Sequence, residues 1–249
     1  MSDVLDGKVA LVTGGSRGLG AATALRLADH GADVAISYHA SPERADAIVE
    51  QLRSKDVRAM AFRADQGDPE QAASLIRQVL DEFGRLDILV NNAAITVRGT
   101  IDDASIDTAQ LERQHAVNYT GIVAGIREAI KHMGEGGRII SIGSGAGTRV
   151  GVPGMTDYAA TKAALAGYTR GAARDLGPRA ITVNILQAGL IDTEMNPADS
   201  EFAAMAAATT ALGRYARPEE VAAGVAFLAR PDSTYVTGTV LNVDGGYSA

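Results

Sequence analysis

The sequence predicts an α/β fold with a mostly parallel sheet of seven strands, doubly wound and covered by helices on both faces. Three observations carry this prediction. Short β-rich runs alternate with alanine-rich helical stretches, a glycine-dense turn joins the first run to the first helical stretch, and the 249 residues contain no linker rich in Pro, Gly or Ser. We therefore expect a single domain over residues 1–249.

Seven short runs are expected to form the strands: Val9 to Thr13, Val34 to Tyr38, Val57 to Arg63, Leu86 to Asn91, Arg138 to Ile142, Ile181 to Leu186 and Val240 to Val243. Helices between successive strands require right-handed crossovers, which make the strands parallel and bury both faces of the sheet. Two helix starts are predicted where a capping residue precedes proline and an acid follows, at Ser41-Pro42-Glu43 and Asp68-Pro69-Glu70. The one irregular stretch is Ala188 to Arg217.

The turn after the first strand reads Thr13-Gly14-Gly15-Ser16-Arg17-Gly18-Leu19-Gly20. Glycines let a ligand approach bare backbone amides, and a helix that starts there favours an anion, so the turn suits a pyrophosphate. The spacing is Gly-x-x-x-Gly-x-Gly, and the Gly-Lys-[Ser/Thr] ending of an ATPase loop is missing, which disfavours a kinase or ATPase. A glycine-rich turn without a ligand is the alternative.

In a doubly wound sheet, ligands bind outside the carboxyl ends of the strands, where the winding reverses. Candidate site residues therefore follow strands, and they are Gly14 to Gly20, Tyr38-His39, Asp65, Asn91 to Ala94, Ser144 and Gln187 to Thr193.

Tyr158 and Lys162 are four residues apart, so on a helix their side chains leave the same face. Lowering the pKa of a phenol from about 10 to neutrality requires roughly 4 kcal/mol, and a nearby ammonium could supply much of it. Ser144 could hold a substrate oxygen near Tyr158, although Ser141 competes for this role. A surface Tyr–Lys pair without function is the alternative.

Taken together, these motifs resemble those of the classical short-chain dehydrogenase/reductases over nearly the full chain. The glycine turn resembles the family's Thr-Gly-x-x-x-Gly-x-Gly, Asp65 its adenine-contacting acid, Asn91-Asn92-Ala93-Ala94 its Asn-Asn-Ala-Gly, and Asn118 its helical asparagine. Ser144 with Tyr158 and Lys162 resembles the catalytic serine and the Tyr-x-x-x-Lys pair.

The resemblance implies a Rossmann fold and a metal-free hydride transfer between a nicotinamide and a carbonyl or alcohol carbon. Tyr158 would protonate the carbonyl oxygen, Ser144 would hydrogen-bond it, Lys162 would bind the ribose and lower the pKa of Tyr158, and Asn118 would hold a relay water. The expected cofactor contacts are Gly14, Ser16, Arg17, Gly18, Leu19, Gly20, Tyr38, His39, Ser41, Asp65, Gln66, Asn91, Ala93, Ala94, Tyr158, Lys162, Gly189, Ile191 and Thr193.

The cofactor is expected to be NADP(H). A carboxylate at the end of the second strand would chelate the adenosine ribose and repel a 2′-phosphate, but this chain has Tyr38 there, and Asp33 lies at the strand's start. Arg17 resembles the guanidinium that NADP-preferring members place on the 2′-phosphate. A solvated loop charge is the alternative reading of Arg17.

A substrate lid is expected at about residues 188–217. Ala188 stands where the family usually has proline, which predicts more freedom in this loop. Apolar residues suggest a pocket for a hydrophobic ketone or aldehyde: Met195, Phe202, Met205, Leu212 and Tyr215, with Ile95, Val97, Val150, Val152 and Met155. Ordinary helix packing is the alternative for each. Two rival functions stay open by resemblance: a 3-oxoacyl-carrier-protein reductase, and a non-catalytic cyclic-dinucleotide-binding regulator.

Composition narrows the remaining classes. The formal net charge of −7 disfavours nucleic acid and anionic membranes as partners, and the absence of cysteine excludes disulfides and thiolate sites. Four scattered histidines offer no metal-ligand spacing. No signal peptide or long apolar run is evident, so we expect a cytoplasmic protein that acts on a small-molecule carbonyl substrate. A homotetramer, or a homodimer, is expected by resemblance.

Overall fold

A computed structural model describes residues 4–201 and 203–249, and its centre is one sheet of seven strands. The strands are β1 (Val9–Val12), β2 (Asp33–Tyr38), β3 (Ala59–Arg63), β4 (Ile88–Asn91), β5 (Arg138–Ser144), β6 (Thr182–Ala188) and β7 (Val240–Val243). Their order is β3-β2-β1-β4-β5-β6-β7, and every neighbouring pair is parallel. The predicted doubly wound fold is confirmed, and the winding reverses between β1 and β4.

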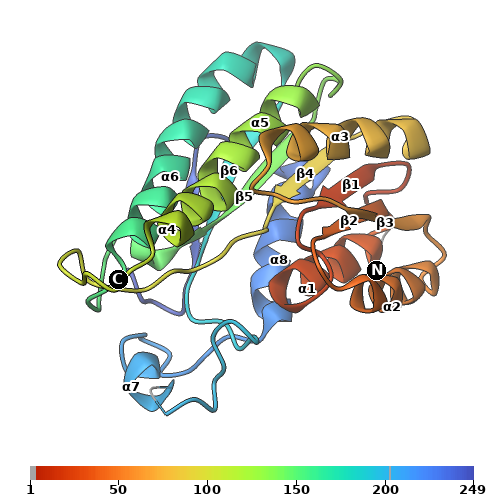
Figure 1. The fold of residues 1–249 in the computed structure, drawn as a ribbon. Coiled ribbons are helices and arrows are strands. Elements are labelled where there is room, and N and C mark those ends of the chain that lie inside the picture. Colours follow the sequence, from red (N-terminus) through yellow and green to blue (C-terminus); the bar gives the residue numbers. More distant parts are fainter. Residues whose placement is uncertain (1–3, 202) are drawn as a thin grey trace.

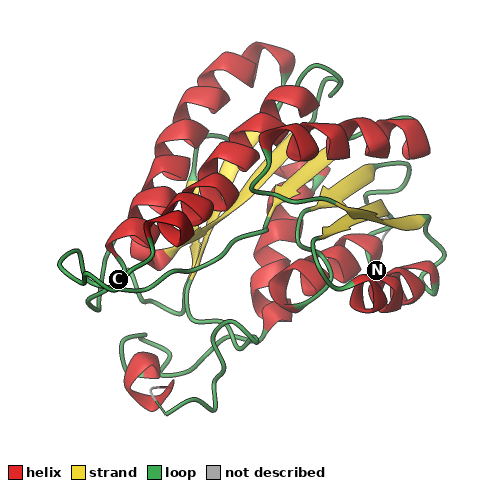
Figure 2. Ribbon diagram, viewed as in Figure 1, coloured by secondary structure: helices red, strands yellow, loops and turns green. Residues whose placement is uncertain are grey.

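The helices lie in two layers, one on each face of the sheet (Figures 1 and 2). They are α1 (Gly18–Ala28), α2 (Pro42–Arg53), α3 (Pro69–Phe83), α4 (Thr108–His115), α5 (Gly121–Ala129), α6 (Thr156–Leu176), α7 (Ala203–Ala207) and α8 (Pro218–Ala229). One π-helical turn, Ala116–Thr120, joins α4 to α5, and short 3₁₀ turns cover Gly145–Gly147, Gly177–Arg179 and Pro231–Ser233.

Successive residues of each strand point to opposite faces of the sheet, and they contribute to two separate hydrophobic cores. On one face, Val12, Ile36 and Ile140 pack with residues of α1, α2 and α8. On the other face, Leu11 and Ile139 pack with residues of α3, α5 and α6. Strands with both faces buried explain why the β-rich runs are apolar throughout rather than alternating. No helix in the two described ranges has the length and hydropathy that crossing a bilayer requires.

Two local predictions have different outcomes at the helix starts. Asp68 caps α3 as predicted, because its side chain accepts the backbone N–H groups of Glu70 and Gln71 at 2.9 and 3.2 Å. Ser41 makes no side-chain cap on α2, although Pro42 does open that helix. Its backbone ψ of 76° departs from the extended conformation that aims a capping oxygen at the first amides.

Strands β5 and β6 run two residues beyond their predicted ends. Gly143 pairs with Gln187, and Ser144 pairs with Ala188. Ala188 also pairs with Val243 of β7. The residue that replaces the family's proline therefore extends the strand, since alanine keeps the backbone N–H that proline lacks.

The stretch between β6 and α8 is the part with the least regular structure. Its described residues form the short helix α7, which stands apart from the two helical layers (Figure 1). Phe202, one of the expected pocket residues, lies outside the described residues.

Candidate active site

Three side chains expected in catalysis meet beside the carboxyl end of β5. Ser144 is the last residue of that strand, and Tyr158 and Lys162 lie one turn apart on α6. The Lys162 ammonium is 3% exposed, donates to the Ile142 carbonyl oxygen at 2.9 Å, and lies 5.7 Å from the centre of the Tyr158 ring. The spacing on α6 thus places a cation under the phenol.

Burial governs the protonation of this group of residues. It raises the pKa of Tyr158, and hydrogen bonding with Ser144 and Thr96 opposes that rise. It lowers the pKa of Lys162 to about 8. The direction for Tyr158 differs from the lowered pKa that the resemblance implies, because the desolvation of the phenolate outweighs the polar contacts in the protein alone. At neutral pH the phenol carries its proton, which is the form that can donate one.

Ser141, the rival of Ser144, lies elsewhere. It is 2% exposed, and its hydroxyl accepts a hydrogen bond from Asn91 Nδ2 at 3.3 Å. Because side chains alternate along a strand, Ser144 and Ser141 leave β5 on opposite faces. Ser144 is the hydroxyl beside Tyr158.

Asn118 lies in the π-helical turn between α4 and α5, a distortion that often marks functional sites. Its side-chain amide donates to the Ile95 carbonyl and accepts the Ile95 N–H, both at 2.9 Å, and Nδ2 also approaches Thr161 Oγ1 at 3.3 Å. The side chain therefore holds the loop after β4 in place. The expected water-holding role of Asn118 stays a prediction.

Thr96 is a polar neighbour of Tyr158 that the sequence reasoning missed. It follows Ile95 in the loop that Asn118 holds, and it adds a second hydroxyl to the one from Ser144. Its Oγ1 also lies 3.8 Å from the sulfur of Met195, in the segment after β6. The signal was present in the sequence, since Thr96 lies two residues beyond the Asn91–Ala94 motif.

The glycine turn between β1 and α1 is tight enough to require its glycines. Gly14 has a φ of +65°, and a Cβ on Gly20 would lie 2.3 Å from the Gly14 carbonyl oxygen. Asn92 braces the turn, because its Nδ2 donates to the Thr13 and Gly14 carbonyls at 2.9 and 3.2 Å. Arg17, at the N-cap of α1, makes no side-chain cap. The first amides of α1 therefore have no protein oxygen from the capping residue, which fits a phosphate ligand.

The expected adenosine end lies beyond β2 and β3. Tyr38 ends β2 and is half-buried, with His39 and Ser41 exposed or nearly so after it. Asp65, after β3, accepts hydrogen bonds from Arg113 and from the Gly67 N–H at 2.5 and 2.8 Å. Burial pulls the pKa of Asp65 upward, but those hydrogen bonds outweigh it and hold the pKa below its ordinary value.

The segment after β6 returns to the glycine turn. Gly189 N–H bonds to the Val243 carbonyl at 3.2 Å, and Ile191 forms a bridge with Ala216. A Cβ on Gly18 would lie 3.3 Å from Thr193 Cγ2, so Thr193 packs directly over the start of α1. Thr193, one of the expected cofactor contacts, therefore reaches the edge of the glycine turn.

Five of the nine described apolar side chains that were expected to form a pocket are exposed, and Val150 and Val152 are among them. Met195, Met205 and Leu212 are 57%, 65% and 65% exposed. A cavity of about 400 Å³ lies instead within the segment after β6. Of the expected residues that the structure describes, Tyr215 alone lines it, together with Asp192, Arg214, Arg217 and several alanines.

The comparisons with known proteins agree with this geometry. A family model described as enoyl-(acyl carrier protein) reductase matches residues 14–248. A short-chain dehydrogenase from Burkholderia cenocepacia, solved in complex with NADP, is 48% identical and superposes with a TM-score of 0.96 over 98% of this chain and 99% of its own.

Two relatives differ in what they are named for. The 3-oxoacyl-[acyl-carrier-protein] reductase of Staphylococcus aureus is 38% identical over 96% of this chain and 97% of its own length. The cyclic-di-GMP-binding biofilm dispersal mediator protein of Escherichia coli is 40% identical over 98% of each chain. Both are similar to this chain from end to end, and on this evidence the chain belongs to the short-chain dehydrogenase/reductase family.

Proposed function

We propose that this protein is an NADP(H)-dependent oxidoreductase that transfers hydride between a nicotinamide and a carbonyl or alcohol carbon, and that it reduces an apolar ketone or aldehyde. One observation carries the proposal: the half-buried phenol of Tyr158 lies beside the Ser144 hydroxyl, and the buried Lys162 ammonium lies 5.7 Å from the centre of its ring. Residues 1–249 would form one catalytic domain, with about 188–217 as the substrate lid.

The residues at the cofactor position fit a dinucleotide with a 2′-phosphate. The uncapped start of α1 suits a pyrophosphate, Tyr38 leaves no carboxylate at the end of β2, and Arg17 offers a guanidinium. The similar protein from B. cenocepacia was solved with NADP, which supports the same choice here.

In the proposed reaction the nicotinamide cofactor supplies the hydride when bound, and side chains of the protein supply the proton and orient the reactants. Ser144 donates a hydrogen bond to the substrate carbonyl oxygen, and Tyr158 gives its proton to the same oxygen as negative charge develops there. Lys162 orients the ribose, and its positive charge stabilises the phenolate that Tyr158 leaves behind.

A second substrate class has its own supporting observation. Burial raises the pKa of Tyr158, and the charge of exposed Arg98 is close enough to that phenol to oppose part of the rise. A cation at the mouth of the site suits an acidic carrier protein, and therefore a 3-oxoacyl thioester substrate. Much faster turnover of acetoacetyl-type thioesters than of simple ketones would favour this class.

We also propose a homotetramer, or a homodimer, in the cytoplasm. Phe227 of α8 and Tyr235 before β7 are 46% and 102% exposed, and apolar surface of this kind favours contact with another subunit. Light scattering coupled to size exclusion measures the subunit number, and a monomer would overturn this part of the proposal.

Tyr158→Phe tests the activity, because it removes the hydroxyl and keeps the ring. We expect turnover to fall by about 10³-fold, within the usual range for a lost general acid, while NADPH affinity changes by less than about twofold. The measurements are NADPH consumption with a panel of ketones and NADPH binding by titration.

Tyr168→Phe is the matched control, since Tyr168 lies on the same helix α6 but packs edge-on against Tyr119. It should keep its turnover. A fully active Tyr158→Phe variant would refute the proposed role, and a wild-type protein that consumes no NADPH yet binds a cyclic dinucleotide tightly would favour the regulator.

A further inference from the structure

Glu194 joins three segments that are far apart in the sequence. It follows Thr193 in the segment after β6, and its two carboxylate oxygens accept from Arg17 Nη1 at 2.8 Å and from Arg44 Nη1 at 2.6 Å. Arg17 lies in the glycine turn, and Arg44 lies in the first turn of α2. The sequence reasoning named neither Glu194 nor Arg44.

The two arginines lie where the backbone is already electropositive. Arg17 is the N-cap of α1, and Arg44 is the third residue of α2, so each guanidinium adds its charge to the positive end of a helix dipole. Cations are normally disfavoured at such ends, and an arginine there points to an anion as its partner. Glu43, in the same turn of α2, forms no ion pair with any residue that the structure describes.

In the protein alone, that anion is Glu194. Hydrogen bonds from Arg44 and Arg17 hold the pKa of its carboxyl below the ordinary range, so it is ionised at neutral pH. The side chains of Arg17, Arg44 and Glu194 are all half or more exposed, at 61%, 50% and 57%. An exposed carboxylate held by two ion pairs can leave at small cost to stability.

We propose that Glu194 is a resident counter-ion that the cofactor's 2′-phosphate displaces from Arg17 and Arg44, and that this exchange loosens the segment after β6 from the glycine turn by removing its ion pairs. The inference rests on the proposed use of NADP(H). A phosphate monoester carries −1.5 to −2 charges and three acceptor oxygens, so it binds the two guanidinium groups more strongly than one carboxylate does. The displaced carboxylate is then repelled by the phosphate.

The exchange gives Glu194 two effects. It lowers the affinity for every ligand with a 2′-phosphate, because that ligand must first remove a competitor. It also makes the lid respond to the phosphate, since NAD(H), which lacks that group, leaves Glu194 on both arginines. Glu194 would therefore be a positioning residue, and its influence reaches the cofactor through Arg17 and Arg44.

The first test compares Glu194→Gln with the wild type for binding of 2′,5′-ADP and of 5′-AMP, which lack the nicotinamide and differ in the 2′-phosphate. We expect the variant to bind 2′,5′-ADP about fivefold more tightly and 5′-AMP equally well, with a difference that shrinks as salt is added. Glu201→Gln removes the same charge from an exposed residue of the same segment and should change neither affinity.

The second test measures hydrogen exchange of residues 192–196 in the wild type. Saturating 2′,5′-ADP should raise the exchange rate there, 5′-AMP should not, and Glu194→Gln should exchange faster without any ligand. The inference would be overturned if Glu194→Gln left the affinity for 2′,5′-ADP unchanged or lowered it. It would also be overturned if 2′,5′-ADP and 5′-AMP had the same effect on hydrogen exchange. Equal affinity of the wild type for the two ligands would instead count against the proposed preference for NADP(H), so the two failures are distinguishable.

Discussion

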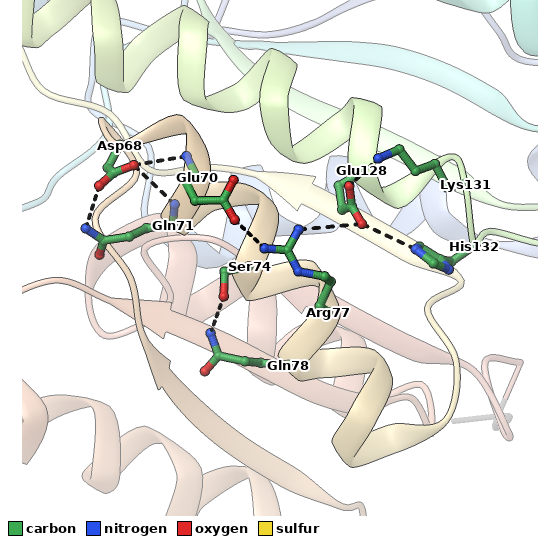
Figure 3. Close-up of polar contacts among 9 residues, drawn as sticks. All are labelled: Asp68, Glu70, Gln71, Ser74, Arg77, Gln78, Glu128, Lys131 and His132. Atoms are coloured by element: carbon green, nitrogen blue, oxygen red, sulfur yellow. Dashed lines mark hydrogen bonds and ion pairs between the residues drawn. The ribbon is translucent and has the colours of Figure 1, made fainter.

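Glu128 and Glu194 each form ion pairs with more than one basic residue, but they lie in parts of the molecule that differ in rigidity. Glu128 of α5 is 10% exposed and lies 2.6 Å from Lys131, 3.4 Å from His132 and 3.7 Å from Arg77 of α3 (Figure 3). Glu194, in the segment after β6, is 57% exposed and binds Arg17 of the glycine turn and Arg44 of α2. Glu128 links the packed helices α3 and α5, whereas Glu194 links a loosely structured segment to the glycine turn and to α2.

The difference lies in what surrounds the charge. Helices α3 and α5 pack together over a buried apolar core. The ion-pair partners of Glu128 therefore stay close to it even when the ion pairs break. Around Glu194 the backbone is held mainly by the contact of Thr193 with Gly18 and by the bridge of Ile191 with Ala216. Similar ion pairs therefore stabilise a scaffold in one place and form an exchangeable contact in the other.

The largest effect should come from adding a methyl group where the scaffold has no room. Gly121 opens α5, and a Cβ there would lie 1.7 Å from the Gln66 carbonyl oxygen, a backbone atom that cannot rotate away. We expect Gly121→Ala to lower the free energy of unfolding by about 4 kcal/mol, because helix α5 or the Gln66 loop must shift. Urea unfolding measures this.

Gly125→Ala is the control on the same helix. The nearest atom to its Cβ would be the Ala72 carbonyl oxygen at 3.8 Å, an ordinary contact. Its helix propensity should leave stability unchanged or raise it by up to about 1 kcal/mol. Equal effects of the two substitutions would mean that the scaffold adapts as readily as the loosely structured segment after β6.

Unlike the partners of Glu128 and Glu194, the buried ammonium of Lys162 hydrogen-bonds to a backbone carbonyl oxygen and not to a carboxylate. Its pKa in the folded protein is about 8, below the ordinary value of 10.5. Below pH 8 the lysine is charged in both states and its burial opposes folding. Between pH 8 and 10.5 the unfolded chain binds more protons, so this penalty disappears as pH rises.

Lys162→Met should remove that dependence. The unfolding free energy of the wild type should gain up to about 3 kcal/mol relative to the variant between pH 7 and pH 10.5. Urea unfolding at several pH values measures the difference. Parallel pH profiles for the two proteins would mean that Lys162 is solvated well enough to keep its charge.

The sequence was sufficient to predict the sheet and the proximity of the proposed catalytic residues, because both depend on local patterns. Apolar runs between helical stretches define parallel strands, and four-residue spacing places Tyr158 and Lys162 on one face of α6. The position of Ser144 followed from the end of β5. None of these required knowledge of which distant segments meet.

The features that could not be predicted from the sequence depend on contacts between distant segments. Thr96 reaches Tyr158 because Asn118 holds the loop after β4, and Glu194 finds Arg44 across 150 positions of sequence. The direction of the Tyr158 pKa also depends on burial, which spacing does not encode. Besides the position of Thr96 next to the Asn91–Ala94 motif, Arg44 carried a local signal as a cation in the first turn of a helix.

The smallest effects should come from neutralising the two carboxylates, and they test the comparison directly. Glu128→Gln should lower the melting temperature by about 3 °C, because Arg77 and Lys131 lose a negatively charged partner whose side chain is only 10% exposed. Its pKa lies below the ordinary 4.5, so the Glu128 contribution is present above that pH and is lost as pH falls through the lower folded-state pKa. Glu194→Gln should change the melting temperature by less than about 1 °C, since exposed ion pairs add little. Thermal scans at pH 7 and pH 3.5 measure both variants, and the Glu128 difference should shrink at the lower pH. If Glu194→Gln lowered the melting temperature as much as Glu128→Gln, its ion pairs would be structural, and the carboxylate would be too firmly held to yield to a phosphate.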